Sequence, residues 1–233
     1  MGNGPTCGTQ WGELLPPRGT KRVVTESALS YGLILAVIWT PRPLQRWLWW
    51  VAAAAVVFMT AVSFDGAKAM GLRAANLLRS SWVIGVALLI AGAAVATAAG
   101  AHTLHVPPSF VPFVGAYFAY AVWSFVQQFL LQSFFLLRFL RLFPAPRGAA
   151  LFAAVLFALA HLPNPVLVPV TFLWGLAACR IFLRYRNLYP LALAHAIFGI
   201  VIAITVPGHL VHNMRVGLGY LTYSRHLHEL PSR

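Results

Sequence analysis

The sequence predicts an all-α, polytopic transmembrane helix bundle of about seven spans. Hydrophobic residues make up 60% of the 233-residue chain and charged residues only 9%, whereas a soluble domain carries roughly 25% charged residues. The mean hydropathy of +0.75 places the chain in the membrane class. The apolar residues also gather into separate runs of the length that bilayer-crossing helices need.

Seven apolar runs account for the expected spans. They occupy residues 23–40, 48–64, 82–99, 109–137, 148–162, 166–184 and 188–206. A transmembrane helix needs about 20 apolar residues, so the long run at 109–137 predicts a tilted or projecting helix. The run at 148–162 is short and stops before Pro163, which predicts a partial or deeply buried helix.

The chain divides into three parts around these runs. Residues 1–22 are polar and rich in Pro and Gly, and we expect a flexible N-terminal lead. Residues 23–206 form the transmembrane helical domain. Residues 207–233 form a C-terminal tail that is too polar to span a membrane, and we expect it to be loosely ordered or to cap the outer mouth of the bundle.

The charge is strongly basic, with seventeen Lys and Arg against four Asp and Glu. In a soluble chain this balance would suggest a nucleic-acid partner. Here the basic residues lie between the apolar runs, so membrane topology explains them and we expect membrane lipids rather than nucleic acid as partners. Most of them fall in segments 18–22, 68–79, 138–147 and 184–186, which predicts a multi-pass integral membrane protein with a cytoplasmic N-terminus.

One stripe of polar residues interrupts the long apolar run at 109–137. It consists of Ser124, Gln127, Gln128 and Gln132, which fall within an arc of about 140° on a helix. Buried amides often hydrogen-bond across membrane helices, so the stripe alone is equally consistent with interhelical contacts. No Asp or Glu lies between Asp65 and Glu229, so the stripe has no acidic neighbour in sequence.

Two histidines lie at a similar depth in later runs. His161 precedes Pro163 at a helix end, and His195 has no polar neighbour within one turn, so its partner must come from another helix or a ligand. At 1.5 Å per residue, Gln128, His195 and His161 lie about 15, 10 and 20 Å from the inner surface. This shared depth favours one functional cavity within the hydrocarbon layer.

These residues resemble the motifs of the CPBP family, the CAAX-protease and bacteriocin-processing group of intramembrane enzymes. The family pattern is Glu-Glu-x-x-x-Arg, then Phe-x-x-x-His, then His-x-x-x-Asn/Asp. Phe157 and His161 match the second motif and His195 begins the third. The resemblance covers about residues 110–200 and implies a CAAX-protease-like core. Gln127, Gln128 and Gln132 stand where the family has Glu, Glu and Arg, and Gly199 stands in the Asn/Asp position.

The motifs and the resemblance together predict the site. We expect His161, His195, Gln127 and Gln128 to be catalytic. The expected substrate-binding residues are Gln132, Ser124, Asn164, Trp123, Phe157, Trp174 and Phe198. Since glutamine cannot accept a proton at physiological pH, ordinary glutamate-dependent proteolysis is disfavoured. The expected substrate is hydrophobic and membrane-embedded, either a lipidated peptide or an isoprenoid-like lipid.

Three functional alternatives remain open from the sequence. The first is a divergent enzyme acting at a Gln/His pocket, the second a conventional intramembrane endopeptidase, and the third a non-catalytic binding or scaffold protein. The sequence implies no particular cofactor. A divalent metal held by His161 and His195 stays open as an alternative, but such a site would be ligand-poor, because catalytic zinc sites usually use three protein ligands.

Overall fold

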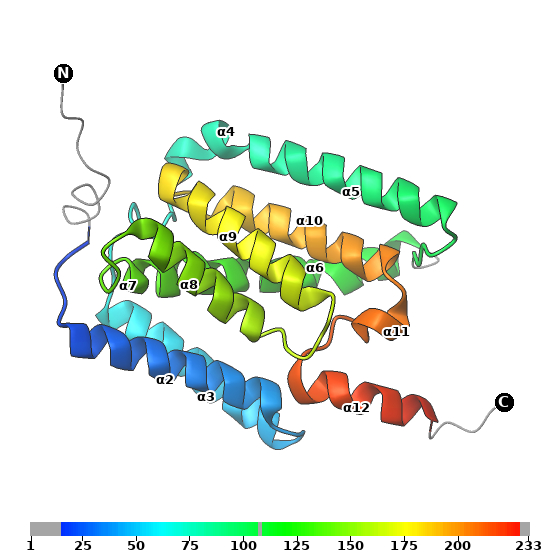
Figure 1. The fold of residues 1–233 in the computed structure, drawn as a ribbon, viewed down its shortest axis with the longest axis horizontal. Coiled ribbons are helices and arrows are strands. Elements are labelled where there is room, and N and C mark those ends of the chain that lie inside the picture. The colour runs from blue at the N-terminus through cyan, green and yellow to red at the C-terminus, as the bar shows by residue number, and fades with distance from the viewer. Residues whose placement is uncertain (1–14, 107–108, 229–233) are drawn as a thin grey trace.

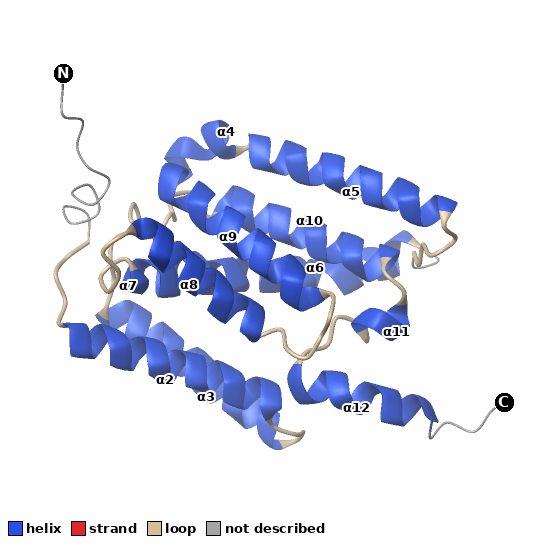
Figure 2. Cartoon of the chain, in the orientation of Figure 1, coloured by secondary structure: helices blue, strands red, loops and turns tan. Residues whose placement is uncertain are grey.

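The computed structural model describes residues 15–106 and 109–228, which form helices joined by short loops, with no strand within those ranges (Figure 2). The first fourteen residues of the expected lead lie outside the described residues. The elements in chain order are α2 (Thr20–Trp39), α3 (Leu44–Val62), η1 (Ala74–Asn76), α4 (Leu77–Ser80), α5 (Trp82–Gly100), α6 (Phe110–Gln128), η2 (Phe129–Leu136), α7 (Leu137–Phe139), α8 (Pro146–Leu159), α9 (Leu167–Tyr185), α10 (Tyr189–Thr205), α11 (Gly208–Val211) and α12 (Gly217–His228).

Every one of the seven apolar runs is helical, which confirms the polytopic helical bundle. Within residues 15–106 and 109–228, five helical stretches are long and apolar enough to cross a membrane: Thr20–Trp39, Leu44–Val62, Leu77–Gly100, Phe113–Phe139 and Leu167–Tyr185. The helices α8 and α10, with 14 and 17 residues, are shorter. At 1.5 Å per residue they reach about 21 and 26 Å, less than the hydrocarbon thickness of about 30 Å.

The bundle is built around α6, α8, α9 and α10 (Figure 1). The α2–α3 hairpin lies on one side of this group and α5 lies on the other, against α10. Small residues let α8 and α9 approach closely, since Ala150, Ala154 and Ala178 are buried and the Gly175 backbone faces Ala154. Close backbone approach at small residues is the usual source of cohesion between membrane helices.

The helix that carries the glutamine stripe changes its hydrogen-bonding pattern halfway along. The segment η2, residues Phe129–Leu136, is a π-helix between α6 and α7, and Gln132 lies inside it. Such segments are rare and occur frequently at functional sites. The wider turn alters which side chains share a face, so the even spacing of 100° per residue assumed from sequence does not hold beyond Gln128.

Buried ion pairs tie the N-terminal helices to the core at the basic end of the bundle. Asp65 pairs with Arg18 and Arg141, both at 2.6 Å. Glu26 pairs with Arg138 at 2.9 Å and Arg22 at 2.8 Å. Residues 15–22, which we assigned to a flexible lead, are therefore anchored in the structure, because Asp65 is almost fully buried and needs its cationic partners.

The described part of the C-terminal tail is also held in place. Asn164 Nδ2 donates hydrogen bonds to the carbonyls of Val211 and Arg215, and Gly217 N donates to Leu162 O at 2.7 Å. Helices α11 and α12 follow the last span, and α12 packs on α2. The described residues 207–223 therefore include a segment held against the bundle, and Asn213, Met214 and Val216 of this segment line its cavity.

Candidate active site

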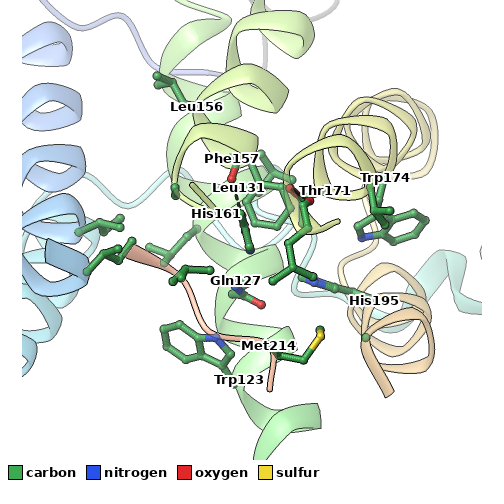
Figure 3. A pocket seen from close by; sticks show the side chains of 18 of the residues that line it. Trp123, Gln127, Leu131, Leu156, Phe157, His161, Thr171, Trp174, His195 and Met214 are labelled. Atoms are coloured by element: carbon green, nitrogen blue, oxygen red, sulfur yellow. Dashed lines mark hydrogen bonds between the residues drawn. The ribbon is translucent and has the colours of Figure 1, made fainter. Parts of the chain in front are cut away.

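A cavity of about 410 Å³ lies among the central helices. Its walls come from α2, α6, η2, α8, α9 and α10, and Asn213, Met214 and Val216 of the C-terminal segment complete it. Figure 3 shows His161, Gln127 and Met214 around this space, with Trp174 and His195 on the helices opposite. Most lining residues are aliphatic or aromatic, as is usual for sites that bind small apolar molecules.

His195 is oriented by a chain of two glutamines from the neighbouring helix. Gln132 Nε2 donates to Gln128 Oε1 at 3.3 Å, and Gln128 Nε2 lies 3.0 Å from His195 Nδ1. Because Gln128 Oε1 already accepts from Gln132, the amide NH₂ of Gln128 faces His195 and donates to Nδ1. A neutral His195 then carries its proton on Nε2. The expectation that His195 takes its partner from another helix is confirmed.

The hydrogen-bonded row of Gln132, Gln128 and neutral His195 contains no charged side chain. Gln128 and Gln132 are both fully buried, and Gln132 Oε1 has no hydrogen-bond partner. Within the described part of the chain, the acidic side chains are Glu26 and Asp65, and both bind arginines at the basic end of the bundle. The position at which the family has a glutamate is therefore served by an amide that orients an imidazole.

His161 has the opposite arrangement. It follows the end of α8, and its Nδ1 lies 2.7 Å from the Phe157 carbonyl oxygen. A carbonyl only accepts, so Nδ1 must carry the proton that makes this bond. The Nε2 atom of neutral His161 is left with a free lone pair, and no described residue donates to it. One imidazole therefore offers an acceptor and the other a donor.

Aromatic rings fix the two imidazoles relative to each other. The Phe157 ring lies 4.9 Å from His161 and 5.8 Å from His195 between centroids, so both rings flank it. Trp174 lies 6.5 Å from His195. A Cβ on Gly175 would approach Phe157 Cδ1 to 3.2 Å, so the small residue allows Phe157 its position.

The structure separates the predicted site residues into two groups. The cavity lining contains Trp123, Gln127, Phe157, His161, Trp174, His195 and Phe198. The fully buried residues Ser124, Gln128, Gln132 and Asn164 lie outside this lining. We expected Gln132, Ser124 and Asn164 to bind substrate; instead Gln132 supports Gln128, Ser124 donates to the Tyr120 carbonyl, and Asn164 holds the C-terminal segment.

Several lining residues were not predicted from the sequence. They are chiefly Tyr31, Ile34 and Ile38 of α2, Tyr120 of α6, Thr171 of α9 and Met214. Tyr31, Tyr120 and Thr171 carry hydroxyl groups within apolar runs, which is the sequence feature that could have indicated them. Tyr31 donates a hydrogen bond to the Leu156 carbonyl. Tyr120 is also notable because its phenol lies against Gly199 and fills the space that a side chain at that position would need.

No group of three or more His, Cys, Asp or Glu side chains that could hold a metal ion occurs in the described ranges. The two imidazoles of the site supply two ligands, whereas catalytic zinc sites usually take three from the protein.

The fold and the site together define a polytopic helical membrane protein whose polar centre is buried among its spans. Residues 107–201 match the family described as type II CAAX prenyl endopeptidase Rce1-like, so this segment is similar to the CAAX-protease family. The matched segment contains both histidines and all three glutamines of the site, but neither α2 nor the C-terminal segment. No curated protein and no solved structure matches the chain.

Proposed function

We propose that this protein is an intramembrane enzyme that processes a hydrophobic, membrane-embedded substrate, either a lipidated peptide or an isoprenoid-like lipid, at the Gln/His pocket. The observation that carries this proposal is the complementary pair of imidazoles beside one cavity. His161 offers a free Nε2 lone pair, and His195, oriented by Gln128, offers an Nε2–H group. The family match supports a substrate with a lipid component.

A base and an acid whose rings both contact Phe157 can share one proton-transfer reaction. In a hydrolysis, His161 Nε2 would take a proton from water, and the His195 Nε2–H would donate to the oxygen that gains negative charge. In an isomerisation, the same two atoms would remove and return a proton. Each such group typically contributes about 10²- to 10⁴-fold in rate, and neither step needs a carboxylate.

The pocket differs from one built for glutamate-dependent proteolysis. A glutamine cannot take up the proton of an attacking water, and the Gln128 amide is already engaged with His195 and Gln132. The two Glu and the Arg of the family motif have all been replaced by neutral amides, which leaves no ionic side chain at these three positions inside the membrane. We therefore assign the proton-accepting role to His161.

Paired histidine variants test the proposal. Cells expressing the wild type, His161→Ala or His195→Ala would be compared by mass spectrometry of membrane lipids and peptides. Each variant should abolish the conversion that the wild type performs, while circular dichroism and thermal unfolding show that the protein still folds. His209→Ala is the matched control, because His209 is exposed on α11 outside the cavity lining.

The possible results separate the alternatives. Conversion by both variants at the wild-type rate would overturn the proposal and favour a non-catalytic binding protein. Loss of conversion in both, with a cleaved peptide as the product, would assign the site to a lipidated peptide. A changed lipid without peptide cleavage would assign it to an isoprenoid-like substrate.

A further inference from the structure

We propose that the pocket selects a ligand with an uncharged polar head, an ester, amide or alcohol on an apolar chain, and rejects carboxylates and phosphates. This inference rests on the proposed function and names the chemical class of its substrate. The lining of the cavity is uncharged, the buried charged groups of the bundle pair with one another, and the polar atoms of the cavity are mainly neutral donors and acceptors.

The described lining of the cavity contains no Lys, Arg, Asp or Glu side chain. The polar side chains that line it are those of Tyr31, Tyr120, Gln127, His161, Thr171, His195 and Asn213, together with the indole N–H groups of Trp123 and Trp174. Thr171 and Tyr31 already donate to backbone carbonyls, at 2.6 and 3.0 Å. A ligand head would therefore meet mainly neutral groups, with the two imidazoles as its strongest hydrogen-bonding partners.

The buried charged side chains cannot neutralise an ionic head, because they pair with one another. Arg138 and Glu26 pair with each other, and Asp65 is shared by Arg18 and Arg141. These residues lie outside the cavity lining. The exposed Arg215 beside Met214 lies over the Tyr223 ring, 4.8 Å from its centroid. An unpaired carboxylate or phosphate in such a site would lose its hydration without gaining a counter-charge, so the pocket discriminates against anions by desolvation.

The overall charge of the protein would favour binding of an anionic ligand over a neutral one. Its formal net charge is +13, which attracts anions to the surface through long-range electrostatics. A preference for a neutral ligand over its anionic counterpart therefore cannot come from the overall charge. It would have to arise in the cavity itself.

The apolar walls leave a place for the chain of such a ligand. Ile34 and Ile38 of α2 and Leu130 of η2 line the cavity together with Phe198 and Ile202 of α10. The volume of about 410 Å³ lies within the range of ordinary small-molecule sites, roughly 300–1,000 Å³. The two imidazoles would meet the head, and the aliphatic and aromatic walls would cover the chain.

A matched pair of probes tests this selection. N-acetyl-S-farnesylcysteine carries a carboxylate at neutral pH, and its methyl ester differs by the loss of that one charge. Binding of each to the purified full-length protein in lipid nanodiscs would be measured by native mass spectrometry. The ester should bind at least tenfold more tightly than the acid to the wild type.

A charge placed in the cavity provides the second arm. Gln127 lines the pocket and is half-buried, so Gln127→Lys should reverse the preference toward the acid. Gln45→Lys adds the same charge outside the cavity lining and should leave the preference unchanged. An ester preference that persists in Gln127→Lys would show that it arises from partition into the bilayer, and would overturn the inference.

Two further outcomes would also overturn it: equal or tighter binding of the acid to the wild type, and binding of neither probe. These binding results are independent of turnover. Equal binding of acid and ester, combined with loss of conversion in His161→Ala and His195→Ala, would refute the neutral-head selection and leave the proposed function standing. Tighter binding of the ester, combined with full conversion in His161→Ala and His195→Ala, would refute the proposed function and leave the neutral-head selection standing.

Discussion

The side-chain amide of Gln128 lies 3.0 Å from Nδ1 of His195, and the same amide accepts a hydrogen bond from Gln132. This contact joins the long helix α6–η2 to α10, and it sets which nitrogen of His195 faces the cavity with a proton. A carboxylate beside a histidine orients the ring by accepting a hydrogen bond from Nδ1–H. Here a neutral amide orients the ring by donating to Nδ1, so the proton of His195 lies on Nε2.

Replacing Gln128 with glutamate should lower the conversion rate at neutral pH by about a hundredfold. A carboxylate would accept from His195 Nδ1–H, so Nε2 would lose the proton that it offers to the substrate. The rate would be measured by mass spectrometry of membrane extracts, with Gln45→Glu as the control outside the cavity. An equal or higher rate in Gln128→Glu would instead indicate a conventional glutamate-dependent peptidase.

The helices and the histidine–glutamine pairing were accessible from sequence because they depend on local patterns. Hydropathy located all seven helical runs, and Pro163 correctly predicted the short α8. The isolation of His195 on its own helix required a partner elsewhere. Sequence could not decide which of Gln127 and Gln128 would meet it, because the two side chains differ by 100° on one helix.

The rest of the site depends on long-range packing that has no local signature. The π-helix at Phe129–Leu136 changes the face on which Gln132 lies, and nothing in its composition distinguishes it from an α-helix. The cavity walls from α2 and Met214 come from segments distant in the chain. The C-terminal segment looked like a polar tail because its low hydropathy carries no information about the bonds that Asn164 makes.

Replacing Asn164 with alanine should loosen the segment that closes the cavity. Asn164 donates to Val211 O and Arg215 O and accepts from two amides at the start of α9. Its loss should destabilise the protein by about 1–3 kcal/mol, since buried backbone groups lose their partners. Hydrogen exchange should accelerate at residues 208–217, whereas Asn76→Ala at the far end should leave those residues unchanged; unaltered exchange in Asn164→Ala would contradict the closing role.

The buried ion pair between Glu26 and Arg138 should contribute far more to the stability of the protein than the exposed pair between Glu26 and Arg22. Glu26→Gln leaves Arg138, 2% exposed in its side chain, without its counter-charge. Removing one partner of a buried pair typically costs about 3–5 kcal/mol. Arg22→Gln removes a cation that is 48% exposed, and exposed pairs contribute about 0–1 kcal/mol. Unfolding in mixed micelles should show this order, and comparable losses in both variants would refute it.

Cys7 offers a test of the cytoplasmic N-terminus that the distribution of basic residues favours. The chain has two cysteines, and Cys179 is fully buried, so a thiol reagent should label chiefly Cys7. In intact cells a membrane-impermeant maleimide should leave the protein unlabelled, and labelling should appear after permeabilisation. Cys7→Ser should abolish the signal. Labelling in intact cells would place the N-terminus on the outer side.

The protonation of the two imidazoles is the most direct test of the account, because their complementary roles carry both proposals. Solid-state NMR of protein labelled with ¹⁵N-histidine in lipid bilayers distinguishes the two tautomers, and spectra of His161→Asn and His195→Asn assign the signals. At neutral pH we expect a proton on Nε2 of His195 and on Nδ1 of His161. A spectrum in which both histidines carry the proton on the same nitrogen would contradict the acid–base pair.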